Sequence, residues 1–248
     1  MTDTPTTRPP AEPSQTAPKG KGLLARVVGV FLSPRATFAD VAARPRALGV
    51  LALGLFVVVI GLYLLLSTEV GQQAWLDQQV QQSEAFGRTI PDAQYQGMER
   101  IAPYIGYIAA GLYLVFIPIA VVILAGILLG VFNALLGGDA TFKQVLAIVT
   151  HAGLITVLQT VFALPLDYVR QTLSSPTTLG VFVPFLEETS FLARLLGMID
   201  LFQIWWLVVL AIGLGVLYKR RTGPIATSLL TVYAVIILGI AAVRSALS

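Results

Sequence analysis

Residues 104–136 read YIGYIAAGLYLVFIPIAVVILAGILLGVFNALL and contain no charged side chain in 33 positions. A hydrocarbon layer about 30 Å thick is crossed by a helix of roughly 20 apolar residues. This stretch therefore predicts a membrane-spanning helix that is longer than a bilayer requires. Pro118 near its middle removes one backbone donor, so we expect a kink or a tilt to absorb the excess length.

Four further apolar blocks have comparable character and lie at 47–66, 142–165, 201–218 and 224–247. The whole chain is 56% hydrophobic and only 12% charged, with a mean hydropathy of +0.81. A soluble domain carries about twice that charge. Since lipid offers the backbone no hydrogen bonds, continuous apolar blocks favour helices over barrel strands. The sequence thus predicts an all-α, polytopic membrane helix bundle with five transmembrane helices.

The chain divides into three regions by composition. Residues 1–21 are rich in Pro and Thr and predict a disordered cytoplasmic tail. Residues 22–46 are too short to span and predict interfacial amphipathic helices, the second starting at Ser33-Pro34. Residues 47–248 form the predicted five-span domain, in which 67–103 holds a surface helix. Within it, segment 173–196 fits either a re-entrant or an interfacial arrangement.

The basic residues predict the orientation of the chain. With the N-terminus inside, the segments on that side hold eleven Lys and Arg residues and those outside hold five. An excess of basic residues marks the cytoplasmic side. We therefore expect a cytoplasmic N-terminus and a C-terminus outside. The basic residues lie at the membrane face, so anionic lipid is their expected partner and nucleic acid is not.

Four polar residues near the membrane are candidates for function: His151, Gln159, Asp167 and Asp200. An ionisable group inside a span is a functional hypothesis, so His151 could serve a proton or cation relay. The simpler alternative is a neutral histidine bonded to a neighbouring helix. Asp167 and Asp200 could pair for acid–base work, although Asp200 at a helix start is explained by capping. The tryptophans 205 and 206 are typical of an interfacial anchor.

Other chemistry finds little support in the sequence. Cysteine is absent and there is one histidine, so the usual three- or four-ligand metal site is not expected. No cofactor motif or nucleophile motif is present, which predicts a protein that is not an enzyme. Gly126 and Gly130 form a small-residue pair typical of close helix packing, within the chain or in a homo-oligomer.

Three segments carry a family resemblance. They are SPRATF at 33–38, GGDATFK at 137–143 and DLFQIWW at 200–206, each next to a predicted span. In this order they resemble the bacterial branch of the Yip domain family, the Ypt/Rab-interacting proteins. The resemblance implies five helices, a cytosolic N-terminus and the bacterial inner membrane. It implies vesicle trafficking through small GTPases for eukaryotic relatives, and it brings no catalytic residues.

Two functions follow from these observations. The first is a non-enzymatic Yip-family membrane protein that organises membrane lipid or partner proteins. The alternative is a small transporter or channel subunit that uses the polar residues around His151.

Overall fold

The computed structural model describes residues 20–187 and 190–247, and these are helical almost throughout. Over those residues no strand forms, and a single isolated bridge pairs Thr178 with Asp200. Of the predicted tail 1–21, all but Gly20 and Lys21 lies outside the described residues.

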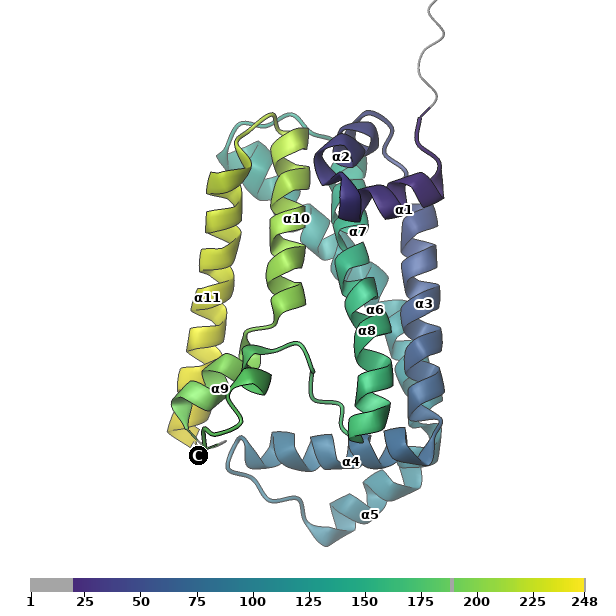
Figure 1. Ribbon diagram of the computed structural model, residues 1–248, viewed down its shortest axis with the longest axis vertical. Coiled ribbons are helices and arrows are strands. Elements are labelled where there is room, and N and C mark those ends of the chain that lie inside the picture. Colours follow the sequence, from purple (N-terminus) through teal and green to yellow (C-terminus); the bar gives the residue numbers. More distant parts are fainter. Residues whose placement is uncertain (1–19, 188–189, 248) are drawn as a thin grey trace, which may run out of the picture.

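The body of the molecule is a bundle of helices, most of them upright in Figure 1. Its members are α3 (Leu48–Leu66), α6 (Ile105–Leu129), α7 (Phe142–Ala152), α8 (Leu154–Arg170), α10 (Leu201–Leu217) and α11 (Thr222–Leu247). In Figure 1, α6 crosses obliquely behind the others. Four continuous segments are long and apolar enough to cross a membrane: Leu48–Leu66, Asp92–Leu135, Phe142–Arg170 and Thr222–Val243. The predicted polytopic helical bundle is confirmed. The fifth predicted span is α10, whose 17 residues reach about 26 Å at 1.5 Å per residue.

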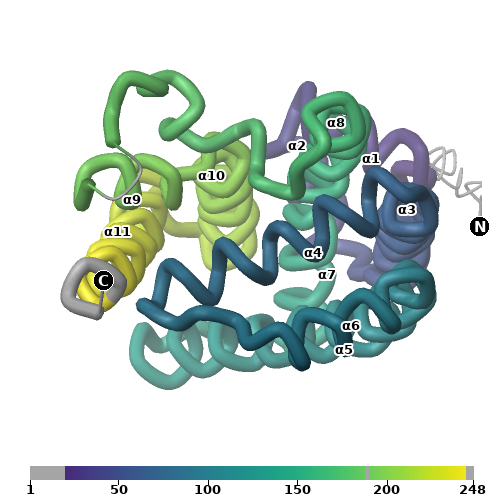
Figure 2. The backbone as a smooth tube through the Cα atoms, turned by 90° about the horizontal axis from the view of Figure 1, so that it is seen from below, coloured from purple at the N-terminus to yellow at the C-terminus, as the bar shows by residue number. Residues whose placement is uncertain are grey.

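Short elements close the two ends of the bundle. At one end lie α1 (Leu23–Leu32) and α2 (Pro34–Ala43), with α1 crossing the start of α3 (Figure 1). At the other end α4 (Glu69–Glu84) and α5 (Asp92–Ile101) run across beneath the bundle (Figure 2). The remaining elements are η1 (Ala102–Tyr104), the π-helical turn η2 (Gly130–Leu135), η3 (Leu179–Phe182) and α9 (Phe191–Met198).

Helices α7 and α10 form the centre of the core. One hydrophobic cluster contains buried residues from both helices, namely Val145, Ile148 and Ala152 of α7 and Leu210 and Leu214 of α10. Helix α2 completes this core, because Phe38 and Val41 are fully buried. By contrast, α6 and α11 expose large apolar side chains along their length, which suits a perimeter in contact with lipid tails.

Most predicted helix ends agree with the structure, and the third span differs. It begins at the predicted Phe142, with a capping box formed by Thr141 and Gln144. It is interrupted at Gly153, and it continues beyond the predicted end at Pro165 as far as Arg170. A proline inside a membrane helix is tolerated because its neighbours can satisfy the freed carbonyl. The helix stops where Gln171 adopts a left-handed conformation with φ 54°.

The small residues of α6 divide into two cases. A Cβ at Gly106 would lie 2.9 Å from Ser67 Oγ, so α6 approaches α3 closely there. A Cβ at Gly126 or Gly130 would meet nothing within 4 Å. The close packing expected at Gly126 and Gly130 therefore does not occur within the described chain.

Gly213 provides a test of the core packing. A Cβ at this position of α10 would lie 2.6 Å from Ile148 Cγ2 and 3.2 Å from the Phe38 ring. We expect Gly213→Ala to lower the free energy of unfolding by about 1–3 kcal/mol, the usual cost of overpacking. Thermal unfolding of the purified protein in one detergent measures the change. Gly239→Ala on α11, where a Cβ meets nothing, is the control, and equal stability of the two variants would contradict this account.

Candidate functional site

A cluster of polar side chains surrounds Asp200 at the start of α10. Its Oδ2 accepts hydrogen bonds from Thr177 Oγ1 at 2.6 Å, Ser175 Oγ at 2.8 Å and Gln159 Nε2 at 2.8 Å. The Asp200 backbone N–H donates to the Tyr233 hydroxyl at 3.2 Å. We refer to Gln159, Ser175, Thr177, Asp200 and Tyr233 as the Asp200 cluster. It joins α8, the 171–178 loop, α10 and α11.

The cap predicted for Asp200 is present. Its Oδ1 accepts from the backbone N–H groups of Phe202 at 2.8 Å and Gln203 at 3.2 Å. These are orphan donors of the first helical turn. Both carboxylate oxygens are thus occupied, with five donors in all. A carboxylate that accepts five hydrogen bonds has its oxygens fully used. This favours a role in linking the helices over acid–base chemistry.

The Asp200 cluster lies within the depth of the bundle. Gln159 stands eleven residues before the end of α8 at Arg170, or about 16 Å at 1.5 Å per residue. The loop after α8 therefore turns back into the bundle to bring Ser175 and Thr177 to this level, and Figure 1 shows it rising toward the start of α10. The first part of segment 173–196 thus returns toward the interior of the bundle. Helix α9 lies beside α11.

His151 lies apart from this cluster. It is fully buried in α7, and its Nδ1 is 2.7 Å from the Ala147 carbonyl oxygen of its own helix. Its Nε2 has no hydrogen-bond partner among the described residues. The sequence suggested a hydrogen bond from His151 to a neighbouring helix. The structure shows a bond within α7 in its place. Gln144, a polar residue nearer the start of the same helix, is engaged elsewhere, since its side chain caps α7 and donates to the Ala42 carbonyl at 3.1 Å.

Asp167 is likewise separate. It follows Gln159 by eight residues on α8, about 12 Å along the helix, so the two candidate carboxylates do not pair at one level. Its buried Oδ1 has no partner among the described residues. The structure therefore brings together Gln159 and Asp200, and leaves His151 and Asp167 as isolated positions.

A second polar cluster joins α1 to α2. Arg26 is only 3% exposed, and its Nε donates to Asp40 Oδ2 at 2.9 Å. Its Nη2 donates to the Arg44 carbonyl at 3.1 Å, and Arg44 Nη1 lies 3.8 Å from Asp40 Oδ1. A buried ion pair of this kind adds little net stability, yet removing one partner is costly. It fixes how α1 docks on α2.

The turns between helices bring basic residues to the same end as this cluster. Arg220 Nη2 donates to the Leu136 carbonyl at 2.6 Å, and the Tyr218 hydroxyl donates to Asn133 Oδ1 at 3.0 Å. This end, which we call the basic end (top of Figure 1), holds Lys21, Arg26, Arg35, Arg44, Arg46, Lys143, Lys219, Arg220 and Arg221.

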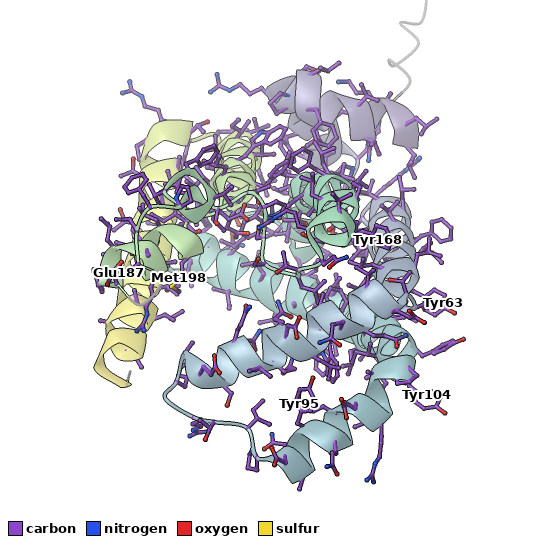
Figure 3. All side chains as sticks on the ribbon, turned by 60° about the horizontal axis from the view of Figure 1, so that its bottom comes forward. Tyr63, Tyr95, Tyr104, Tyr168, Glu187 and Met198 are labelled. Atoms are coloured by element: carbon purple, nitrogen blue, oxygen red, sulfur yellow. The ribbon has the colours of Figure 1, made fainter. Side chains whose placement is uncertain are left out.

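The opposite end carries tyrosines at its rim. Figure 3 shows Tyr63, Tyr104 and Tyr168 around the end formed by α4 and α5. The Tyr63 and Tyr107 rings meet edge to face with centroids 5.1 Å apart. Tyrosines are typical of the membrane–water boundary. Trp205, which the sequence placed in such a belt, instead packs against Phe31 of α1 with centroids 6.0 Å apart.

The sequence missed several members of these clusters. Ser175, Thr177 and Tyr233 are separated from Asp200 by 25, 23 and 33 residues, and no local pattern marks them. The burial of Arg26 was not expected either, because the sequence predicts interfacial helices for residues 22–46. The one available signal that this arginine faces inward was its place among Leu, Val and Gly, four residues into a helix.

Together, the fold and these clusters define a polytopic helical membrane protein with one basic end and a hydrogen-bonded polar cluster inside the bundle. Over residues 20–187 and 190–247, no group of three or more His, Asp or Glu residues is placed to hold a metal ion. The family model of the Yip1 domain matches residues 28–243, and the chain belongs to this family. No curated protein and no solved structure gives a significant match.

Replacing Asp200 tests whether its cluster holds the bundle together. Asp200→Ala removes a cap, at about 1 kcal/mol, and leaves buried donors unsatisfied at about 1–3 kcal/mol each. We expect a loss of about 3 kcal/mol or more in the free energy of unfolding, measured in detergent. Asp77→Ala, which removes an exposed carboxylate bonded to Gln73, should change it by less than about 0.5 kcal/mol. An equally small effect at Asp200 would show that the cluster is not the link described here.

Proposed function

We propose that this Yip1-family membrane protein is not an enzyme and organises anionic lipid, or proteins held at a membrane surface, at its basic end. One observation carries the proposal: basic residues from three separate parts of the chain meet at this end, next to an exposed apolar helix. The α1–α2 region, the α6–α7 turn and the α10–α11 turn each contribute. Juxtaposed basic and apolar surface is suited to an anionic bilayer.

Helix α1 supplies the apolar part of this surface. Leu24, Val28 and Leu32 recur every four residues and so share one face. They are 75%, 53% and 80% exposed, respectively. The opposite face of α1 buries Arg26 and Val30 against the bundle. The helix thus presents apolar side chains outward while the ion pair to Asp40 holds it in place.

The same distribution of charge supports an orientation. At the end opposite the basic end, the acidic residues Glu69, Asp77, Glu84, Asp92 and Glu99 lie on α4 and α5. By the positive-inside rule we infer that the basic end and the N-terminus face the cytoplasm and the C-terminus lies outside. A bacterial inner membrane is the setting that the family resemblance suggests.

Single-cysteine labelling tests the orientation, because the chain has no cysteine of its own. Ala36 on α2 is exposed, a Cβ at Gly97 on α5 would meet nothing within 4 Å, and the two positions lie at opposite ends. In intact bacterial cells, a membrane-impermeant maleimide should label Gly97→Cys. Ala36→Cys should react only after the membrane is opened. The reverse pattern would refute the inferred orientation.

Lipid sorting tests the proposed role. In vesicles of phosphatidylcholine with a minor fraction of fluorescent phosphatidylglycerol, the protein should enrich the anionic lipid around itself. Each basic residue near an anionic surface contributes about 1 kcal/mol, so Lys219→Gln with Arg221→Gln should reduce the enrichment several-fold. Arg88→Gln with Arg100→Gln removes two charges from the opposite end and serves as the control. Absence of enrichment by the unaltered protein would count against the proposal.

A polar pocket favours a second candidate, a transporter or channel subunit. The pocket has a volume of about 740 Å³ between α4 and the 171–184 segment, and its lining includes Gln78, Arg170, Ser175 and Thr178. It therefore extends from the end opposite the basic end to the Asp200 cluster. Proteoliposomes loaded with a pH-sensitive dye distinguish the two candidates. Proton flux above that of empty vesicles, lost in His151→Ala, would favour transport, whereas the first proposal expects no such flux.

A further inference from the structure

A small pocket at the basic end is lined by residues of α1 and of the start of α3. Figure 1 shows α1 crossing the start of α3 there. Its volume is about 190 Å³. The lining residues are Lys21, Leu23, Arg26, Arg46, Gly49 and Val50. Three of these six are basic and none is acidic, so we call it the basic pocket.

The charge around the basic pocket is not balanced. Asp40 is the carboxylate in ion-pair contact with a lining residue, through Arg26 at 2.9 Å. It also accepts from the backbone N–H of Lys21 at 3.3 Å. Among the described residues, one carboxylate therefore faces the charges of Lys21, Arg26 and Arg46, with Arg44 beside them. The surplus is positive, and it favours a bound anion.

The backbone adds to this preference for an anion. Leu23 is the first residue of α1, while Gly49 and Val50 are the second and third residues of α3. Neither helix has a side-chain cap or an acidic residue in its first turn. The first-turn N–H groups lack partners within the helix, and the helix dipole is positive there. Two helix starts and three basic side chains thus converge on one small volume.

The surroundings of the basic pocket are apolar and exposed. Leu23, Leu24 and Leu48 are 41%, 75% and 78% exposed, and α3 continues from Leu48 as a membrane-spanning segment. A soluble anion would gain nothing from this apolar rim, whereas a lipid would place its acyl chains on it. The volume is also below the roughly 300–1,000 Å³ of typical small-molecule sites and suits a headgroup phosphate.

We propose that the basic pocket binds the phosphate of one anionic phospholipid, with the acyl chains lying along the exposed start of α3. Arg26 is preorganised by its bonds to Asp40 and to the Arg44 carbonyl, and an arginine held in this way suits phosphate recognition. Lys21 and Arg46 supply the remaining charge. This inference rests on the proposed function and deepens it, because it places a stoichiometric lipid site within the broader basic end.

Native mass spectrometry of the full chain in detergent tests the site, with dioctanoyl phosphatidylglycerol as the probe. We expect one lipid to bind saturably. Lys21→Gln with Arg46→Gln should weaken binding by more than about tenfold, since each basic residue near anionic lipid contributes about a factor of five. The matched control is Arg35→Gln with Lys143→Gln, which removes two exposed charges of the basic end outside the pocket and should change binding less than about twofold. Thermal unfolding without lipid verifies that both variants are folded.

Three results would overturn the inference. Equal weakening in the two double variants would mean that general surface charge, not the pocket, holds the lipid. Equal binding of dioctanoyl phosphatidylcholine would mean that anionic charge is not recognised. Inorganic phosphate binding as tightly at the same residues would make a free anion the occupant.

The outcome is separable from that of the proposed function. Persistent phosphatidylglycerol enrichment in vesicles, without saturable binding of one lipid, would refute the pocket and keep the proposed function. Saturable binding of one lipid without enrichment in vesicles would refute the proposed function and keep the pocket.

Discussion

Lipid hydrocarbon cannot satisfy a polar group, and the rest of this structure depends on that constraint. Where the chain is regular, as in α3 and α6, the helical backbone satisfies itself. The 171–178 loop is irregular at the level of Gln159 and needs other partners. The Asp200 cluster supplies them, since its side chains and the bridge from Thr178 to Asp200 pair the polar groups of the loop with those of α8, α10 and α11.

The two ends of the bundle are built on different principles. At the basic end, α2 is driven into the core by Phe38 and Val41, and the ion pair of Arg26 with Asp40 fixes α1 across it. At the opposite end, α4 and α5 lie across the bundle, and the hydrogen bond from Gln78 to the Leu173 carbonyl ties α4 to the loop after α8. One end presents positive charge beside apolar surface, and the other presents amides, carboxylates and tyrosines. This polarity underlies the proposed orientation and role.

Features that depend on neighbouring residues were predictable from the sequence. Long apolar runs located the spans, and the Thr141–Gln144 spacing located a helix start to the residue. Features that depend on distant contacts were not. The donors to Asp200 come from up to 41 residues away, and the burial of Arg26 follows from how α1 docks. Pro165 was misread as a helix end because a local rule for water-soluble helices does not apply where neighbouring helices surround the backbone. Gly126 and Gly130 carried a packing motif, but only the structure shows that no helix of the described chain meets them.

The Asp200 cluster also has a consequence for synthesis of the protein. Gln159, Ser175 and Thr177 emerge from the ribosome before Asp200, whereas Tyr233 emerges 33 residues after it. The carboxylate thus finds its side-chain donors as soon as α10 forms, but the backbone N–H of Asp200 waits for the last helix. The contacts among α8, the 171–178 loop and α10 are therefore incomplete until α11 is in place. A chain truncated before Tyr233 would leave the backbone N–H of Asp200 without this partner inside the bundle.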